Sequence, residues 1–134
     1  MNISNLTRQH EEIRACMDNV LNYISKNNLA DSAADIAKEL NMLAGKLKIH
    51  LISENDFLYP DLLKSSNLKV KELAEAYMDE MTSIGDKFMK YKDNYNTKTK
   101  IESNVDAFIR DTKETFQLLE VRLNKEDKEL YPKL

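Results

Sequence analysis

The amino-acid sequence predicts an all-α protein, folded as an up-down-up-down antiparallel four-helix bundle built from two similar helical hairpins. Apolar residues recur at spacings of three and four through nearly all of the 134 residues, which is the pattern of amphipathic helices. Only two glycines and two prolines are present, too few turn residues for a β-sandwich or a β-barrel. Short loops between the apolar stripes favour antiparallel neighbours, and residues 1–134 are expected to form a single domain.

The first half of the chain contains two predicted helices. Apolar residues follow the helical period over residues 6–24, and this stripe stops at Asn27 and Asn28, which favour a helix end. The period resumes over residues 33–58. Ser32 is the expected N-cap there, because its hydroxyl can accept a hydrogen bond from a free backbone N–H of the first turn. These two helices are expected to form the first hairpin.

The second half repeats this plan. Pro60 is expected to end the second helix, because a proline ring clashes inside an α-helix. Periodic apolar residues then define a third helix over residues 70–91 and a fourth over residues 105–130. Thr99, with a glutamate three residues later, has the spacing of a capping box before the fourth helix. Pro132 is expected to end that helix.

Composition excludes several classes of function. A formal net charge of -3 with no basic cluster predicts no nucleic-acid partner. One cysteine is too few for a disulfide framework or a zinc ribbon. No apolar run reaches the roughly 18 residues of a membrane span, so no membrane partner is expected. The first residues lack a basic segment followed by an apolar stretch, so no secretory signal is expected and the protein is predicted to be cytoplasmic.

An internal repeat relates the two hairpins. Residues 50–62 (HLISENDFLYPDL) and residues 122–134 (RLNKEDKELYPKL) are identical at six of 13 positions, at an offset of 72. A weaker match at an offset of 68 aligns residues 9–13 with residues 77–81. The LYP triplet in each copy is interpreted as a helix end whose Tyr and Leu cover the end of the bundle, and not as a site of chemistry.

Several ionisable residues lie on the apolar stripes, where they face the core: His10, His50, Glu54, Arg122 and Glu126. His50 and Glu54 are four residues apart, so their side chains share one face of a helix. A carboxylate in a protein interior needs a hydrogen-bonded cation or a metal ion, because an isolated buried charge is very costly. Inward-facing Glu and His side chains on neighbouring helices are also the ligands with which bundles build metal sites.

These segments resemble a known family. HLISENDFLYP is similar to the second-helix motif of hemerythrin-like domains, the HHE cation-binding family, in which H-x-x-x-E is followed by L-Y-P. RLNKEDKELYP resembles the fourth-helix motif of that family, with Arg in place of His, and LTRQHEEI resembles its first-helix motif. The resemblance covers almost the whole chain. It implies a bundle with a core metal site, usually two irons bridged by two carboxylates and held by five histidines. Members bind or sense dioxygen, handle iron or act in repairing nitrosative damage.

The resemblance implies a ligand set of which one half is complete. His10 and His50 match the two histidines that hold one iron in the family. Glu54 and Glu126 match the two carboxylates that bridge the irons. One metal ion is therefore expected in the bundle core.

The resemblance also implies that the second iron site is incomplete. Its third-helix histidine pair is replaced by Met78 and Thr82 or, in the alternative register, by Tyr77 and Met81. Its fourth-helix histidine is replaced by Arg122. A guanidinium group stays protonated and has no lone pair for a metal. We therefore expect no second metal, and we expect Arg122 to pair with one or both of the bridging carboxylates.

Two functions from different classes follow. The first is a cation-binding protein that holds one metal ion, with iron favoured over other divalent cations, in a sensing or iron/oxygen-handling role. Its small-molecule partner would be dioxygen or a related molecule. The second is a metal-free bundle with a structural or regulatory role, in which contacts among His, Glu and Arg replace the metal. The sequence favours no enzymatic reaction, because it offers no nucleophile, substrate pocket or cofactor fingerprint.

Overall fold

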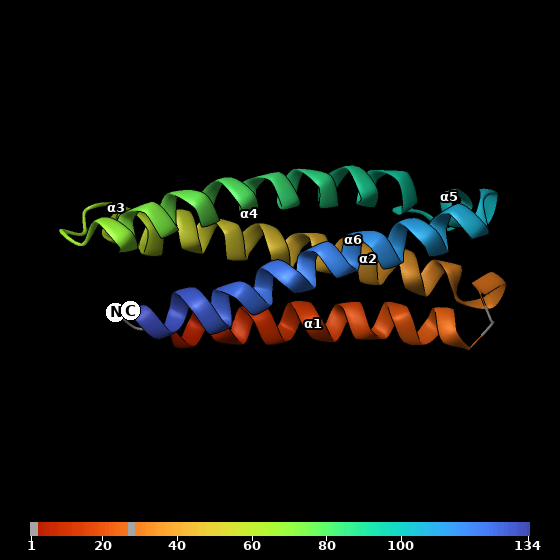
Figure 1. The fold of residues 1–134 in the computed structure, drawn as a ribbon. Helices are drawn as coiled ribbons and strands as arrows, with labels where there is room; N and C mark the ends of the chain where they lie inside the picture. Colours follow the sequence, from red (N-terminus) through yellow and green to blue (C-terminus); the bar gives the residue numbers. More distant parts are fainter. Residues whose placement is uncertain (1–2, 27–28) are drawn as a thin grey trace.

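The computed structural model describes residues 3–26 and 29–134, and it confirms the predicted all-α bundle of two similar hairpins. Four long helices lie side by side along one axis: α1 (Ser4–Ser25), α2 (Leu29–Ser53), α4 (Leu68–Tyr95) and α6 (Val105–Lys125). Successive long helices run in opposite directions (Figure 1). The start of α1 and the C-terminal end of the chain therefore lie together at one end of the bundle.

Shorter elements connect and extend the long helices. Two π-helical turns, η1 and η2, directly continue α2 and α6, and each is followed by a short helix that begins at a tyrosine. The bounds of these elements are η1 Glu54–Leu58, α3 Tyr59–Leu63, α5 Lys98–Ser103, η2 Glu126–Leu130 and the 3-10 helix η3 Tyr131–Lys133. Each long helix packs against two others, in the order α1, α2, α4, α6 and back to α1, so the four helices enclose one interior.

The apolar stripes of the helices form two buried clusters. The larger cluster includes Ile13, Leu47 and Leu123, and the smaller one includes Leu6 and Leu130. Burying a side chain of this size contributes about 1.5–3 kcal/mol, so both clusters hold the helices firmly in register. Four of the five ionisable residues predicted to face the core, all except Arg122, lie on the helical turns between the two clusters, and they form a polar layer across the bundle.

The helices do not end at the prolines of the LYP segments, contrary to the prediction. In η1 the Tyr59 N–H donates to the carbonyl of Glu54, five residues earlier, and in η2 the Tyr131 N–H donates to the carbonyl of Glu126. A proline ring clashes with the carbonyl four residues earlier in a regular α-helix, and a widened turn before the proline relieves that clash. The helical path therefore continues past each proline, through α3 and through η3.

The start of α2 also differs from the prediction. The helix already begins at Leu29, so Ser32 is a buried residue inside the helix and not its N-cap. Ala and Asp in the first turn continue the helical path, and an acidic residue is favourable at that end of the helix dipole. Asn27 and Asn28, the predicted end of the first helix, lie outside the described residues. The helix α1 ends at Ser25.

The predicted fourth helix, residues 105–130, corresponds to α6 and η2, and the separate short helix α5 precedes it. The side chain of Thr97 caps α5 by accepting a hydrogen bond from the Lys100 N–H. The side chain of Asn104 caps α6 by accepting one from the Ala107 N–H. Thr99 therefore lies inside α5 and does not act as the predicted cap. Among the described residues, no helix is both long enough and apolar enough to cross a membrane.

Candidate metal centre

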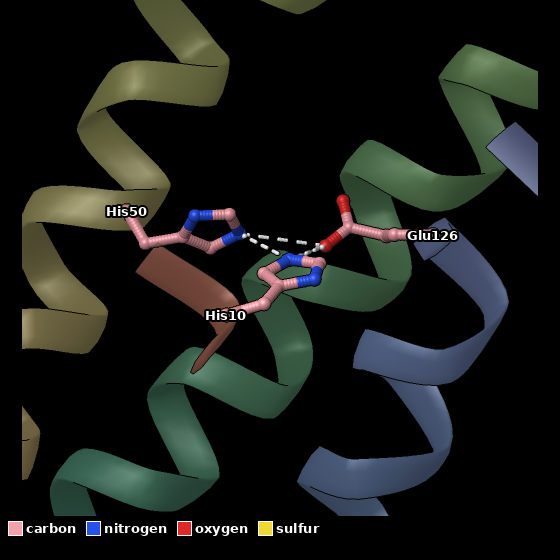
Figure 2. A group of neighbouring side chains, drawn as sticks. All are labelled: His10, His50 and Glu126. Atoms are coloured by element: carbon pink, nitrogen blue, oxygen red, sulfur yellow. Dashed lines mark hydrogen bonds and ion pairs between the residues drawn. The ribbon is translucent and has the colours of Figure 1, made fainter. Parts of the chain in front are cut away.

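Four side chains from four elements meet in the polar layer. His10 comes from α1, His50 from the last turn of α2, Glu54 from the start of η1 and Glu126 from the start of η2. Each of them is at most 1% exposed. Figure 2 shows His10, His50 and Glu126 pointing toward one another from three separate segments. The structure therefore brings together in the core four of the five residues that the sequence pattern assigned to it, all except Arg122.

The inward atoms of this group lie at contact distance. The Nε2 atoms of His10 and His50 are 3.0 Å apart. Glu126 Oε1 lies 3.1 Å from the first nitrogen and 3.4 Å from the second. Glu54 Oε1 lies 3.0 Å from the Nε2 of His50. One ligand atom from each of His10, His50 and Glu126 lies within 4.8 Å of the others, a spacing that could hold a metal ion.

A carboxylate fixes the orientation of the His10 ring. Its Nδ1 lies 2.8 Å from Asp127 Oδ1, and the other oxygen of Asp127 accepts a 2.8 Å hydrogen bond from Arg14. An ionised carboxylate can only accept hydrogen bonds, so Nδ1 of His10 carries a proton. In the neutral form of the ring, Nε2 then presents its lone pair to the polar layer. This is the carboxylate–histidine arrangement that orients metal-binding imidazoles in proteins.

A chain of hydrogen bonds fixes the His50 ring in the same way. The Ser53 hydroxyl donates to the carbonyl of Ile49, 2.9 Å away, so it accepts the hydrogen bond from the Gln9 amide nitrogen at 3.2 Å. The amide oxygen of Gln9 therefore faces Nδ1 of His50, at 2.9 Å. Because that oxygen accepts, Nδ1 carries a proton, and Nε2 of the neutral ring is directed inward with its lone pair.

The inward faces of the site therefore offer only acceptors when both rings are neutral. Acceptor atoms at this separation repel one another unless a proton or a cation lies among them. Donor atoms about 2.1 Å from one metal ion are about 3.0 Å apart at right angles and about 3.4 Å apart in a tetrahedron. The measured separations range from 3.0 to 3.4 Å. The donor set and its spacing both fit a single cation.

The two glutamates have opposite pKa shifts. Burial and the neighbouring charge of Glu126 raise the pKa of Glu54 well above its ordinary value. Burial acts in the same direction on Glu126, but the close contacts of its carboxylate with Glu54, His10 and His50 outweigh burial and lower the Glu126 pKa. Glu54 Oε1 is buried and forms no hydrogen bond with any described residue. A buried carboxylate oxygen without a donor, next to an imidazole nitrogen, is a suitable ligand for a positive ion.

Two tyrosines complete the site, and the sequence interpretation missed both of them. The Tyr59 hydroxyl donates to Glu126 Oε2 at 3.1 Å, and the Tyr131 hydroxyl donates to Glu54 Oε2, also at 3.1 Å. Tyr131 also lies 3.2 Å from Nε2 of His10. Each hairpin therefore supplies the phenol that binds the carboxylate of the other hairpin. The signal was present in the repeat, because both tyrosines follow their glutamates at the same spacing.

Arg122 does not pair with the bridging glutamates, so that part of the prediction is wrong. Its guanidinium forms an ion pair with Glu80 of α4 and lies over the ring of Tyr77, 5.1 Å from the ring centroid. The remaining oxygens of the bridging glutamates already accept hydrogen bonds from the two tyrosines. Glu80 is half exposed, and an ion pair that retains contact with water requires less desolvation than one in the polar layer.

On α4, the register that faces the core contains Tyr77 and Met81. Both of these side chains are buried, whereas Met78 is partly buried and Thr82 is exposed. Met78 and Thr82 line a surface pocket between α4 and the η1–α3 segment. The Tyr77 hydroxyl donates to Glu129 of η2. No nitrogen ligand is available on this side, because both histidines of the sequence lie in its first half.

Comparison with known families agrees with this geometry. Residues 1–134, the whole chain, match the family model described as the hemerythrin HHE cation binding domain. No curated protein and no solved structure matches the chain. The family is described as cation-binding, and the polar layer contains a group of His and Glu side chains that could hold a metal ion.

Proposed function

The chain belongs to the hemerythrin HHE cation-binding family, and from this premise we propose that it binds one divalent metal ion in the polar layer, with iron favoured. The ligands would be His10, His50, Glu54 and Glu126. The observation that carries the proposal is the pair of imidazole Nε2 atoms, 3.0 Å apart, whose Nδ1 atoms both face hydrogen-bond acceptors. Two rings held in this way direct two lone pairs at one point beside two carboxylates.

The donor set supports iron. Two imidazoles with carboxylates suit ferrous iron that keeps open coordination positions, although zinc and manganese also accept such ligands. Bound iron would supply one-electron redox chemistry and a position for a small molecule such as dioxygen. The chain itself contributes ligand orientation through Asp127 and Gln9 and a buried environment between two apolar clusters. We infer a role in sensing dioxygen or a related molecule, or in handling iron.

The residues on the other side of the polar layer support one ion and not two. The buried residues beside it on α4 and α6 carry a phenol, a thioether and a guanidinium, namely Tyr77, Met81 and Arg122. None of them supplies the imidazole nitrogen that a second ion would need, and a guanidinium stays protonated and has no lone pair for a metal. The proposed stoichiometry is therefore one ion per chain.

A metal-free role is the second candidate, and one observation favours it. Burial opposes the charged form of His50, but hydrogen bonds and charges from Glu126 and Glu54 outweigh burial and raise the His50 pKa to about 9. A proton on His50 could therefore supply the positive charge that the four acceptors require. In that case the polar layer would be a structural network in a bundle with a regulatory or structural role.

Metal content distinguishes the two candidates. We expect protein incubated with ferrous iron without oxygen, then desalted, to contain about one iron per chain by elemental analysis. His50→Ala should reduce this ratio to near zero, because it removes one imidazole ligand. Glu126→Gln should weaken binding by about tenfold or more. Glu114→Gln, at an exposed position of α6, is the matched control and should bind like the wild type.

Each alternative result has a defined meaning. A wild-type ratio near zero for iron, zinc and manganese would reject the cation site and leave the structural network. A ratio near two would reject the single-ion stoichiometry. Equal binding by His50→Ala and the wild type would show that the metal lies elsewhere on the chain.

A further inference from the structure

The hydroxyl of Tyr131 lies among the atoms that would hold the ion. Nε2 of His10 lies 3.0 Å from Nε2 of His50 and 3.1 Å from Oε1 of Glu126, and all three atoms belong to proposed ligands. The hydroxyl oxygen of Tyr131 lies 3.2 Å from the same His10 nitrogen. The phenol oxygen is therefore separated from this nitrogen by the distance that separates two ligand atoms of one metal ion.

The proton of the Tyr131 hydroxyl is not directed at His10. The hydroxyl donates it to Glu54 Oε2, 3.1 Å away. Nδ1 of His10 carries its own proton toward Asp127, so Nε2 of the neutral ring offers a lone pair. The phenol oxygen and the His10 nitrogen therefore face each other as two acceptors, a contact that a nearby cation makes favourable.

Packing holds the Tyr131 ring in this position. The residue is buried, and its ring stacks on the imidazole of His10 with 5.2 Å between the centroids and 26° between the planes. Tyr131 directly follows η2, the turn that begins at Glu126. One short segment therefore carries both the phenol and a proposed ligand, and the two side chains keep a fixed spatial relation.

Tyr59, the counterpart of Tyr131 in the other hairpin, has a different environment. Its hydroxyl donates to Glu126 Oε2 at 3.1 Å. Among the described residues, this hydroxyl forms no hydrogen bond with either imidazole. The two phenols are equal in the repeat but not in the site, because Tyr131 contacts a ligand nitrogen as well as a carboxylate.

We propose that Tyr131 is a further ligand of the bound ion and coordinates ferric iron through its phenol oxygen, an inference that rests on the metal site proposed above. Tyrosine is an iron ligand in other proteins. When the iron–oxygen bond forms, the O–H bond breaks, and the proton moves to Glu54 Oε2, which already accepts that hydrogen bond. The electron that ferrous iron loses on oxidation goes to an external one-electron acceptor.

A phenolate ligand favours one of the roles considered for the site. Its negative charge stabilises ferric iron more than ferrous iron, so it lowers the reduction potential of the bound iron. It also fills a coordination position that a small molecule would otherwise use. The handling of iron in its ferric form is therefore favoured over the sensing of dioxygen.

Absorption spectroscopy of iron-loaded protein tests this proposal. The protein is loaded with ferrous iron without oxygen, oxidised with ferricyanide and desalted, and its iron content is measured by elemental analysis. Phenolate bound to ferric iron gives a charge-transfer band in the visible range, which imidazole and carboxylate ligands alone do not give. We expect this band in the wild type and its loss in Tyr131→Phe, with the iron content of both proteins near one per chain.

Two other variants assign the band to one tyrosine. Tyr59→Phe and Tyr77→Phe each remove another buried phenol near the polar layer, and both should retain the band. Their retention of the band assigns it to Tyr131 even if Tyr131→Phe holds too little iron for a spectrum. Circular dichroism should show that all three variants are folded, because each change removes a single hydroxyl.

The outcomes separate this ligand from the metal site itself. Wild-type protein that holds ferric iron without a visible charge-transfer band would overturn the proposal, as would a band that persists in Tyr131→Phe. Loss of the band in Tyr59→Phe, with iron still bound, would move the ligand to the other hairpin. A wild type that binds no iron would instead reject the metal site and this ligand with it.

Discussion

Tyr59 and Tyr131 are the residues whose hydroxyls form hydrogen bonds with the two glutamates of the polar layer. Each phenol donates a hydrogen bond to a glutamate from the opposite hairpin. For Glu54 this donor is especially important, because the other oxygen of that carboxylate forms no hydrogen bond with any described residue. A buried acceptor that loses its donor retains the full penalty of desolvation.

Tyr131→Phe should therefore destabilise the metal-free protein by about 1–3 kcal/mol. The change removes the hydroxyl that binds Glu54 and leaves the ring in place. Urea unfolding in the presence of a chelator measures the effect. Tyr23→Phe is the control: Tyr23 is a partly buried residue of α1 outside the polar layer, and its change should be below about 0.5 kcal/mol. Equal effects for the two variants would contradict the assigned role of Tyr131.

The sequence predicted the acids and histidines of the site better than their partners. His10, His50, Glu54 and Glu126 could be found because they interrupt apolar stripes whose period fixes the buried face. The partner of Arg122 could not be found in this way. A long side chain on a stripe can point toward either neighbouring helix, and the choice of Glu80 depends on the packing of α4 against α6.

Among the elements, the two π-turns are the ones that align the site. Glu54 begins η1 and Glu126 begins η2, and a tyrosine of the site directly follows each turn. The extra residue in each turn shifts every later side chain by about 100° around the helix axis relative to an uninterrupted α-helix. Removing one residue should therefore leave the following tyrosine directed at the polar layer but restore a regular turn, which the proline after that tyrosine cannot join without a clash.

Deletion of Lys128 tests this explanation. Lys128 is an exposed residue inside η2, and its deletion should convert the π-turn to an α-turn, in which the ring of Pro132 clashes with the carbonyl four residues earlier. We expect the helical circular dichroism to persist while stability falls by at least about 2 kcal/mol. Lys128→Ala, which keeps the turn, is the matched control and should have little effect. Deletion without loss of stability would show that the π-turn is not what accommodates the proline.

The sequence predicted the number and direction of the long helices but not all of their ends. Periodicity identifies a helix because it reports which face is buried, and it does so over many turns. The ends depend on single hydrogen bonds, such as the one from the Ala107 N–H to the Asn104 side chain, for which periodicity carries no signal. A π-turn adds only one residue to the spacing, which is within the variation of an ordinary apolar stripe.

For the whole molecule, the polar layer makes stability dependent on pH. The His50 pKa is raised to about 9 in the folded protein, because the two glutamates outweigh the effect of burial. An unfolded chain has the ordinary histidine pKa of about 6.5. The folded state therefore binds the proton more tightly. This contribution to stability is fully present below pH of about 6.5 and is lost as the pH rises through about 9.

Metal-free protein should accordingly lose up to about 3 kcal/mol of unfolding free energy between pH of about 6.5 and 9. Urea unfolding with a chelator at several pH values in this range measures the loss. His50→Gln should show a much flatter profile, because the group that takes up the proton is gone. A wild-type profile as flat as that of the variant would show that His50 does not hold a proton in the folded state.

The whole fold could be predicted because four amphipathic stripes with short connections leave few other ways to bury their apolar faces. The hydrogen bonds between the hairpins could not be predicted. A repeat shows which residues of the two hairpins correspond, but it does not show that each tyrosine binds the glutamate of the other hairpin. Tyr59 with Glu126 and Tyr131 with Glu54 form such an exchanged set.

This crossed bonding makes the two hairpins interdependent. Glu54 and Glu126 each accept a hydrogen bond from a tyrosine of the other hairpin, so neither hairpin alone holds its glutamate in place. An ion bound by residues of both hairpins would stabilise their packing against each other, because its binding free energy is added to the free energy of that packing. Loss of the ion and loosening of the end of the bundle that contains the start of α1 and the LYP segments would then be one coupled event.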